Sequence, residues 1–176
     1  MIKKLALIIF ILIMKINLFG DQGNQISCGI DYSLMELTAK AERSSKREVG
    51  YPYVISFNKG IVYEKYIQHY KYQRLDSRSI DCLNIDNCVS ILNSLINQRV
   101  TNVDLGAFQL NYNSHKIPQR KYFHLESSYE KACSIIEDLV SRYGYSWETI
   151  ARYHSSTDEY NRNYRKILAN IIASKE

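Results

Sequence analysis

Residues 33–42 read SLMELTAKAE, and this stretch contains the signals of the first helix expected after the apolar N-terminal run. Ser33 with Glu36 three positions later forms a capping box, in which each side chain bonds to the backbone N–H of the other residue. Apolar residues then recur at helical spacing up to Ala41. Glu42 follows at the margin of this apolar stripe, where a carboxylate can be partly desolvated while it still faces a groove. The stretch therefore predicts a helix that ends in a half-buried Glu.

Start signals of the same kind recur along the rest of the chain. Helices are predicted to begin at Asp86, Ser127, Ser146 and Ser156, and Gly144 is expected to end the second of them. The inward face of the last helix is expected to hold apolar and aromatic residues, namely Tyr160, Tyr164, Ile167, Leu168 and Ile171.

A β element is expected after the first helix. Side chains alternate along 53–57, a turn signal follows at 58–60, and an extended pattern resumes at 61–63. Residues 52–66 therefore predict a small β-hairpin, whereas 67–84 show no clear period and predict a loop. The expected fold class is α+β, mostly α: a single domain with a small β-hairpin.

The first twenty residues differ from the remainder. Two Lys residues precede a short apolar run, and a polar stretch begins at Asp21. This layout predicts a signal peptide over 1–20 and an oxidising, periplasmic destination; a membrane anchor is the alternative. The segment carries three of the 23 Lys and Arg residues and none of the 18 acids, so the mature chain would carry +2. A charge this small argues against a nucleic-acid partner.

Four cysteines lie in the expected mature chain: Cys28, Cys82, Cys88 and Cys133. An even number behind a signal peptide favours disulfides over free buried thiols. Three pairings are possible. Cys82 with Cys88 would close a short loop, and Cys28 with Cys133 would then tie the first helix to a late one. The cysteine spacing gives no sign of a metal site.

Three segments could carry chemistry. They are Ala41-Glu42 at the end of the first helix, the stretch GAFQLN at 106–111, and Ala151-Arg152-Tyr153. Each alone has an ordinary explanation: a Glu near a helix end is usually solvated, a Gly–Gln–Asn loop can bond to its own backbone, and a Tyr on an apolar face is usually core. The residues by themselves indicate a secreted, helix-rich domain.

In order and spacing, however, the three motifs resemble those of the lytic transglycosylases with the goose-lysozyme-like fold. They are most similar to the small members that accompany type IV secretion systems, in which the third motif often continues as Tyr-His-Ser, as at 153–155. The resemblance covers roughly residues 28–172. It implies that 21–176 form a lysozyme-like transglycosylase domain. The chain departs from the pattern at Arg43, where the family usually has Ser.

The resemblance also implies an activity. Glu42 would be the one catalytic carboxylate in cleavage of the β-1,4 bond between N-acetylmuramic acid and N-acetylglucosamine in peptidoglycan, with 1,6-anhydro-muropeptides as products. Gln109, Asn111 and Tyr153 would bind the substrate, and no cofactor or metal is needed. Secretion-system components would be further partners. Two alternatives stay open: a lysozyme-type hydrolase, and an inactive wall-binding assembly protein, which the Arg43 departure would favour.

Overall fold

The computed structural model describes residues 27–174, so the expected signal peptide at 1–20 lies outside the described residues. The helices within 27–174 are α2 (Tyr32–Glu42), α3 (Glu64–Ile67), α4 (Ile85–Asn97), α5 (Gln119–Tyr122), α6 (Leu125–Tyr143), α7 (Trp147–Ala151) and α8 (Asp158–Ala173). The strands in the same range are β1 (Val54–Phe57), β2 (Gln73–Arg74), β3 (Ser79–Asp81), β4 (Val103–Leu105) and β5 (Leu110–Asn111). The expected α+β, mostly helical fold class with a small antiparallel β element is confirmed.

The strands form one antiparallel sheet in the order β2-β3-β1-β4-β5. In the register of the sheet, Ile55 of the central strand lies opposite Ile80 of β3 and Leu105 of β4. All three side chains are fully buried. Apolar side chains from three strands that are distant in the sequence therefore pack at the centre of the sheet and stabilise it.

The partners of β1 differ from the expected hairpin. The strand itself forms as expected, but residues 61–63 are not a strand. Tyr63 instead turns inward and stacks on Phe57, with ring centroids 4.5 Å apart, and α3 begins at the next residue. Two strands, β2 and β3, lie within 67–84, where a loop was expected. Alternating side chains indicate which face of a strand is buried, but they do not indicate which strand pairs with it.

Asp31 caps α2, and the expected capping box at Ser33 is absent. The Asp31 carboxylate accepts from the Ser33 backbone N–H at 2.8 Å and also from the Ser33 hydroxyl. Glu36 accepts from Lys40 one turn later. Asp31, two residues before Ser33, therefore provides the hydrogen-bond acceptor for the first turn, and α2 begins at Tyr32.

The predicted start of α7 is confirmed, because the Ser146 hydroxyl accepts from the backbone N–H of Thr149 at 3.1 Å. The end of α6 is also confirmed: Gly144 follows its last residue with φ +74°. Helix α4 is capped by Asn84 in place of Asp86, which instead pairs with an arginine.

Helices α6 and α8 also begin away from the expected residues. Helix α6 starts at Leu125, and Ser128 lies buried within its first turns. The N-cap of α8 is Thr157. On α8 the residues Tyr164 and Leu168 are buried as expected and Ile171 is half-buried, but Tyr160 and Ile167 are exposed. Fewer apolar residues of α8 are therefore buried than the sequence pattern predicts.

Both expected disulfides are present. Cys28 joins Cys133, with their Cα atoms 5.9 Å apart, and Cys82 joins Cys88 at 5.0 Å. The first bond fixes the segment before α2 to α6, and the second fixes the end of β3 to α4. No cysteine within 27–174 is free.

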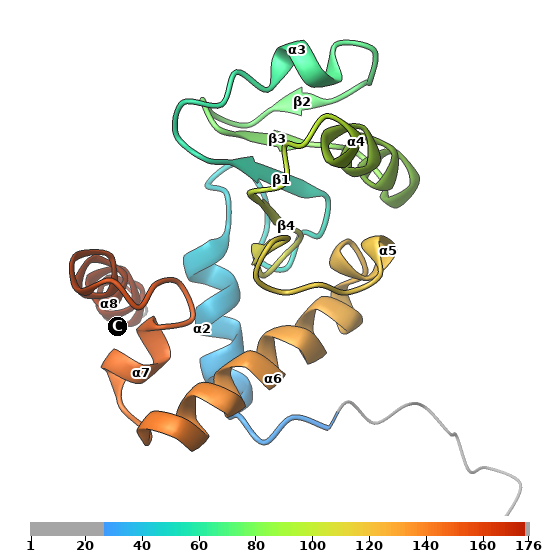
Figure 1. Cartoon of the computed structure of the whole chain (residues 1–176). Helices are drawn as coiled ribbons and strands as arrows, with labels where there is room; N and C mark the ends of the chain where they lie inside the picture. Colours follow the sequence, from blue (N-terminus) through green and yellow to red (C-terminus); the bar gives the residue numbers. More distant parts are fainter. Residues whose placement is uncertain (1–26, 175–176) are drawn as a thin grey trace, which may run out of the picture.

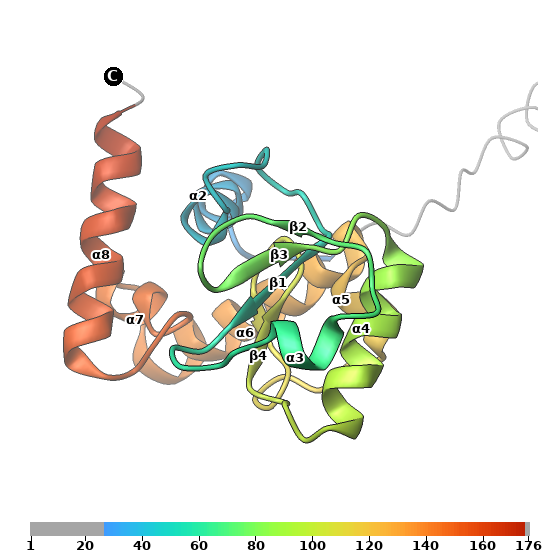
Figure 2. The same ribbon diagram turned by 90° about the horizontal axis from the view of Figure 1, so that it is seen from above.

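The sheet and α3, α4 and α5 lie together, and α2, α6, α7 and α8 form a second group beside them (Figure 1). Seen from above, α8 stands at the far side of α2 from α4 (Figure 2). Helix α2 packs against α8, and its C-terminal end points toward the sheet. This arrangement places Glu42, the last residue of α2, at the junction of the two groups. None of the helices among the described residues is both long and apolar enough to cross a bilayer.

Candidate active site

Glu42 lies where α2 ends, because Arg43 already has an extended backbone. Its side chain is only 10% exposed. The carboxylate oxygen Oε1 is buried without a hydrogen-bond partner, and the Nδ1 atom of His154 lies 3.6 Å from it. A nearly buried carboxylate with a histidine beside it makes this part of the molecule a candidate active site.

His154 reaches Glu42 from the segment between α7 and α8. Its ring stacks flat on Tyr164 of α8, with centroids 4.7 Å apart and planes 1° from parallel. The neighbouring Glu42 carboxylate, as an acceptor, raises the pKa of His154, while burial acts in the opposite direction. Burial, followed by the charge of Glu42, raises the pKa of the Tyr164 phenol well above its ordinary value.

Tyr153 connects the third motif to the second. Its hydroxyl donates to the backbone carbonyl of Phe108 at 2.7 Å. Burial raises the pKa of Tyr153 well above its ordinary value, and the charges of Glu42 and Asp104 act in the same direction. Tyr153 therefore lies within electrostatic reach of Glu42, with its proton already donated to a protein carbonyl. Its role in substrate binding stays a prediction.

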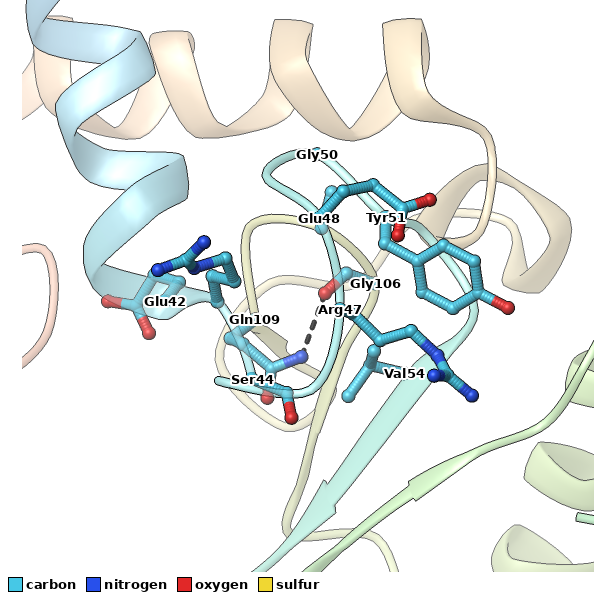
Figure 3. A pocket seen from close by; sticks show the side chains of 11 residues that line it. Glu42, Ser44, Arg47, Glu48, Gly50, Tyr51, Val54, Gly106 and Gln109 are labelled. Atoms are coloured by element: carbon cyan, nitrogen blue, oxygen red, sulfur yellow. Dashed lines mark hydrogen bonds between the residues drawn. The ribbon is translucent and has the colours of Figure 1, made fainter. Parts of the chain in front are cut away.

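Gln109 shares a pocket with Glu42, Ser44 and Gly106. Figure 3 shows Glu42 at the end of α2, with Gln109 and Ser44 beside it. The Gln109 amide nitrogen donates to the carbonyl of Gly106 at 2.8 Å, and its backbone has a positive φ of +46°. The second motif is thus a tight turn that places Gln109 beside the catalytic candidate.

Asn111 is placed differently from Gln109, because protein groups occupy its whole side chain. Its amide nitrogen donates to Asn102 and Asp104, each at 2.8 Å. Its oxygen accepts from the backbone N–H groups of Asn113 and Ser114. Asn111 does not line the Glu42 pocket. This geometry gives Asn111 a structural role at the β4–β5 turn, and the predicted substrate contact remains untested.

Asp104 is a second carboxylate near the site that the sequence reasoning did not single out. It lies on β4 and is partly buried. Burial raises its pKa, the Asn111 amide lowers it, and the charge of Glu42 raises it further. Its only sequence signal is an acid beside the Gly106 turn. His154 was noted as a continuation of the third motif and Tyr164 as an inward residue of the last helix, because sequence alone does not show that they reach Glu42.

The loop after Glu42 is anchored to the sheet through Asp81, which is only 2% exposed. Arg47 donates to Asp81 from two nitrogens, at 2.7 Å from Nε, and the Tyr51 hydroxyl donates to the same carboxylate at 2.9 Å. Burial and Asp81 raise the pKa of Tyr51 to about 12. Arg43 is exposed and lines the pocket. Within 27–174, the ion pair found for Glu42 is with His154 and not with Arg43.

The turn of the second motif requires glycine at its first position. Gly106 has φ +77°, and a Cβ there would lie 2.0 Å from the backbone oxygen of Tyr122. We expect Gly106→Ala to lower the free energy of unfolding by about 3 kcal/mol, from backbone strain and overpacking together. Gly60→Ala is the matched control, because Gly60 has φ +91° with no atom within 4 Å. That change should cost about 1 kcal/mol.

Urea denaturation followed by far-ultraviolet circular dichroism measures both changes. Equal losses in the two variants would contradict the close approach of Tyr122 to Gly106.

Comparison of the chain with protein-family models, curated proteins and solved structures gives no match.

Proposed function

We propose that this protein is a peptidoglycan lytic transglycosylase in which Glu42 is the catalytic acid and base. The observation that carries the proposal is the meeting of the three motifs at one carboxylate. The Glu42 pocket includes Gly106 and Gln109 of the second motif, and His154, next to Tyr153 of the third, pairs with Glu42. Residues that resemble a known catalytic set only in sequence order therefore also lie together in space.

The chemistry would proceed in two proton transfers on Glu42. Protonated Glu42 gives its proton to the glycosidic oxygen, and the bond to the anomeric carbon breaks. The N-acetyl group of the muramic sugar stabilises the positive charge at that carbon. Ionised Glu42 then takes the proton from the C6 hydroxyl, whose oxygen closes on the anomeric carbon. Glu42 ends protonated, no water is consumed, and the product is a 1,6-anhydro sugar.

The burial of Glu42 supports this role. Its side chain is only 10% exposed and one carboxylate oxygen is buried without a hydrogen-bond partner, so the carboxyl group lies at a site from which water is largely excluded. No cofactor or metal enters either step. The substrate lies in the cell wall, so the proposal includes export to the periplasm, which suits the two disulfides. Local wall opening for a type IV secretion system would be its use, with components of that system as partners.

A lysozyme-type hydrolase is the second candidate, and the specific observation in its favour is Asp104. Most glycosidases use two carboxylates, one as acid and one as base or nucleophile. The charge of Glu42 contributes to the raised pKa of Asp104, so two acids lie within electrostatic reach of each other. In a hydrolase, a water near Asp104 would attack the anomeric carbon in place of the C6 hydroxyl, and a carboxylate would take the proton of that water.

Product analysis separates these candidates. Purified peptidoglycan is incubated with the protein, and the released muropeptides are analysed by mass spectrometry. We expect anhydro-muropeptides, which are lighter than the hydrolysed products by one water. Reducing-end muropeptides would show a hydrolase and direct attention to Asp104. Wall binding without any release would favour an inactive assembly protein, with Arg43 as the first residue to revert to Ser.

A further inference from the structure

His154 is the neighbour of Glu42 that neither proton transfer above employs. The imidazole is held on one face by the ring of Tyr164, which is itself buried at 1% exposure. One ring nitrogen, Nδ1, lies 3.6 Å from the buried oxygen of Glu42, and the His154 side chain as a whole is still 47% exposed. The ring is therefore fixed in place while it remains open to protons from solvent.

The groups that face His154 come from every element around it. Glu42 approaches from the end of α2, Asp104 from β4 and Tyr164 from α8, and Tyr153 precedes it in the chain. Two of these are carboxylates and two are phenols whose raised pKa values keep them neutral. A positive charge on the imidazole is therefore favoured by its surroundings, mainly by Glu42 and more weakly by Asp104.

On the basis of the proposed function, we infer that His154 is a positioning residue that holds the ionised form of Glu42. When Glu42 has given its proton to the leaving oxygen, negative charge appears on a side chain whose Oε1 is buried. The imidazolium of His154 donates its Nδ1–H toward Oε1 and offsets this charge. When Glu42 takes the proton of the C6 hydroxyl, the pair loosens. His154 keeps its own proton throughout, so the proton balance of the reaction is unchanged.

This role predicts that activity decreases when the pH is raised. The pKa of His154 is raised in the folded protein above the ordinary value of about 6.5. The positive charge on His154 is therefore fully present below pH ~6.5 and is lost as the pH rises through the raised pKa of His154. Activity should fall on the alkaline side because the imidazole becomes neutral.

The first test measures the pair without any activity. The four His residues of the protein are titrated by NMR in the wild type and in Glu42→Gln, and the His154 signal is assigned by its loss in His154→Phe. We expect the pKa of His154 to fall by about one unit in Glu42→Gln. His115 is the internal control, since burial and Lys131 lower its pKa and Glu42 is not among the causes. An unchanged His154 titration would overturn the inference.

The second test is a pH–rate profile of muropeptide release for the wild type, His154→Phe and His154→Gln. Phenylalanine can keep the ring over Tyr164 but has no proton to donate, whereas glutamine keeps a neutral donor without the ring. For His154→Phe we expect kcat to fall about tenfold at pH 6, KM to stay nearly constant, and the alkaline limb to become less steep, because only the loss of the Glu42 proton then contributes to it. His154→Gln should show the same less steep alkaline limb, with a higher rate than His154→Phe. His69→Phe, at an exposed His, should match the wild type.

The outcomes separate this inference from the proposed function. If the wild type is active and His154→Phe keeps both its rate and the steepness of its alkaline limb, the positioning role is wrong and the transglycosylase proposal stands. If the wild type releases nothing at any pH, the proposed function fails, and the positioning role fails with it even where NMR shows the pair. Circular dichroism of each variant excludes loss of folding as the cause.

Discussion

Glu42→Gln is expected to reduce muropeptide release by about a thousandfold. The amide has nearly the same shape as the carboxyl group but can neither give a proton to the leaving oxygen nor take one from the C6 hydroxyl. Both halves of the proposed reaction therefore fail together. The pocket and the stacked rings of His154 and Tyr164 should persist, because neither depends on a charge at Glu42. The rate of release by mass spectrometry is the measurement.

The matched control is Glu126→Gln, which removes an exposed acid in the first turn of α6. It should release muropeptides at the wild-type rate. Both variants should unfold in urea close to the wild-type midpoint, which shows that any loss is chemical. A Glu42→Gln protein that keeps more than about a tenth of wild-type activity would be inconsistent with a general acid at this position.

Removing the Cys28–Cys133 disulfide by a double substitution to Ala is expected to lower the free energy of unfolding by about 5 kcal/mol. The two cysteines are separated by 105 positions in the sequence. The bond therefore lowers the conformational entropy of the unfolded chain over a long segment. Without the bond the unfolded chain regains this entropy, which favours unfolding. Loss of the bond also frees the segment before α2 from α6.

The internal comparison is the same double substitution at Cys82 and Cys88, which are separated by only 6 positions. Its expected cost is about 2 kcal/mol, because closure of a short loop restricts the unfolded chain less. Urea denaturation of both double variants measures the difference. If the short-loop variant loses as much stability as the long-loop variant, the restriction of the unfolded chain is not the main contribution of the Cys28–Cys133 bond.

Part of the candidate site could be predicted from residues that are close in sequence. The position of Glu42 at a helix end follows from the apolar spacing before it, and the turn that places Gln109 follows from Gly106. The contacts of Asn111 and Tyr153 could not be predicted. Both side chains bond to protein groups: Asn111 donates to Asn102 and Asp104, and Tyr153 donates to the distant carbonyl of Phe108.

The sequence by itself determined the helix-rich fold class, the Ser146 start and Gly144 end, and the four cysteines as two disulfides. The helix signals are local, because a side chain bonds or packs within about one turn of its own position, whereas the disulfides were expected from the even number of cysteines. The separate strand partners of β1 and the pairing of Glu42 with His154 were decided only by the tertiary structure. Contacts of this kind require closure of long loops, whose entropy cost is offset only when the whole core assembles. No short stretch of sequence holds that information.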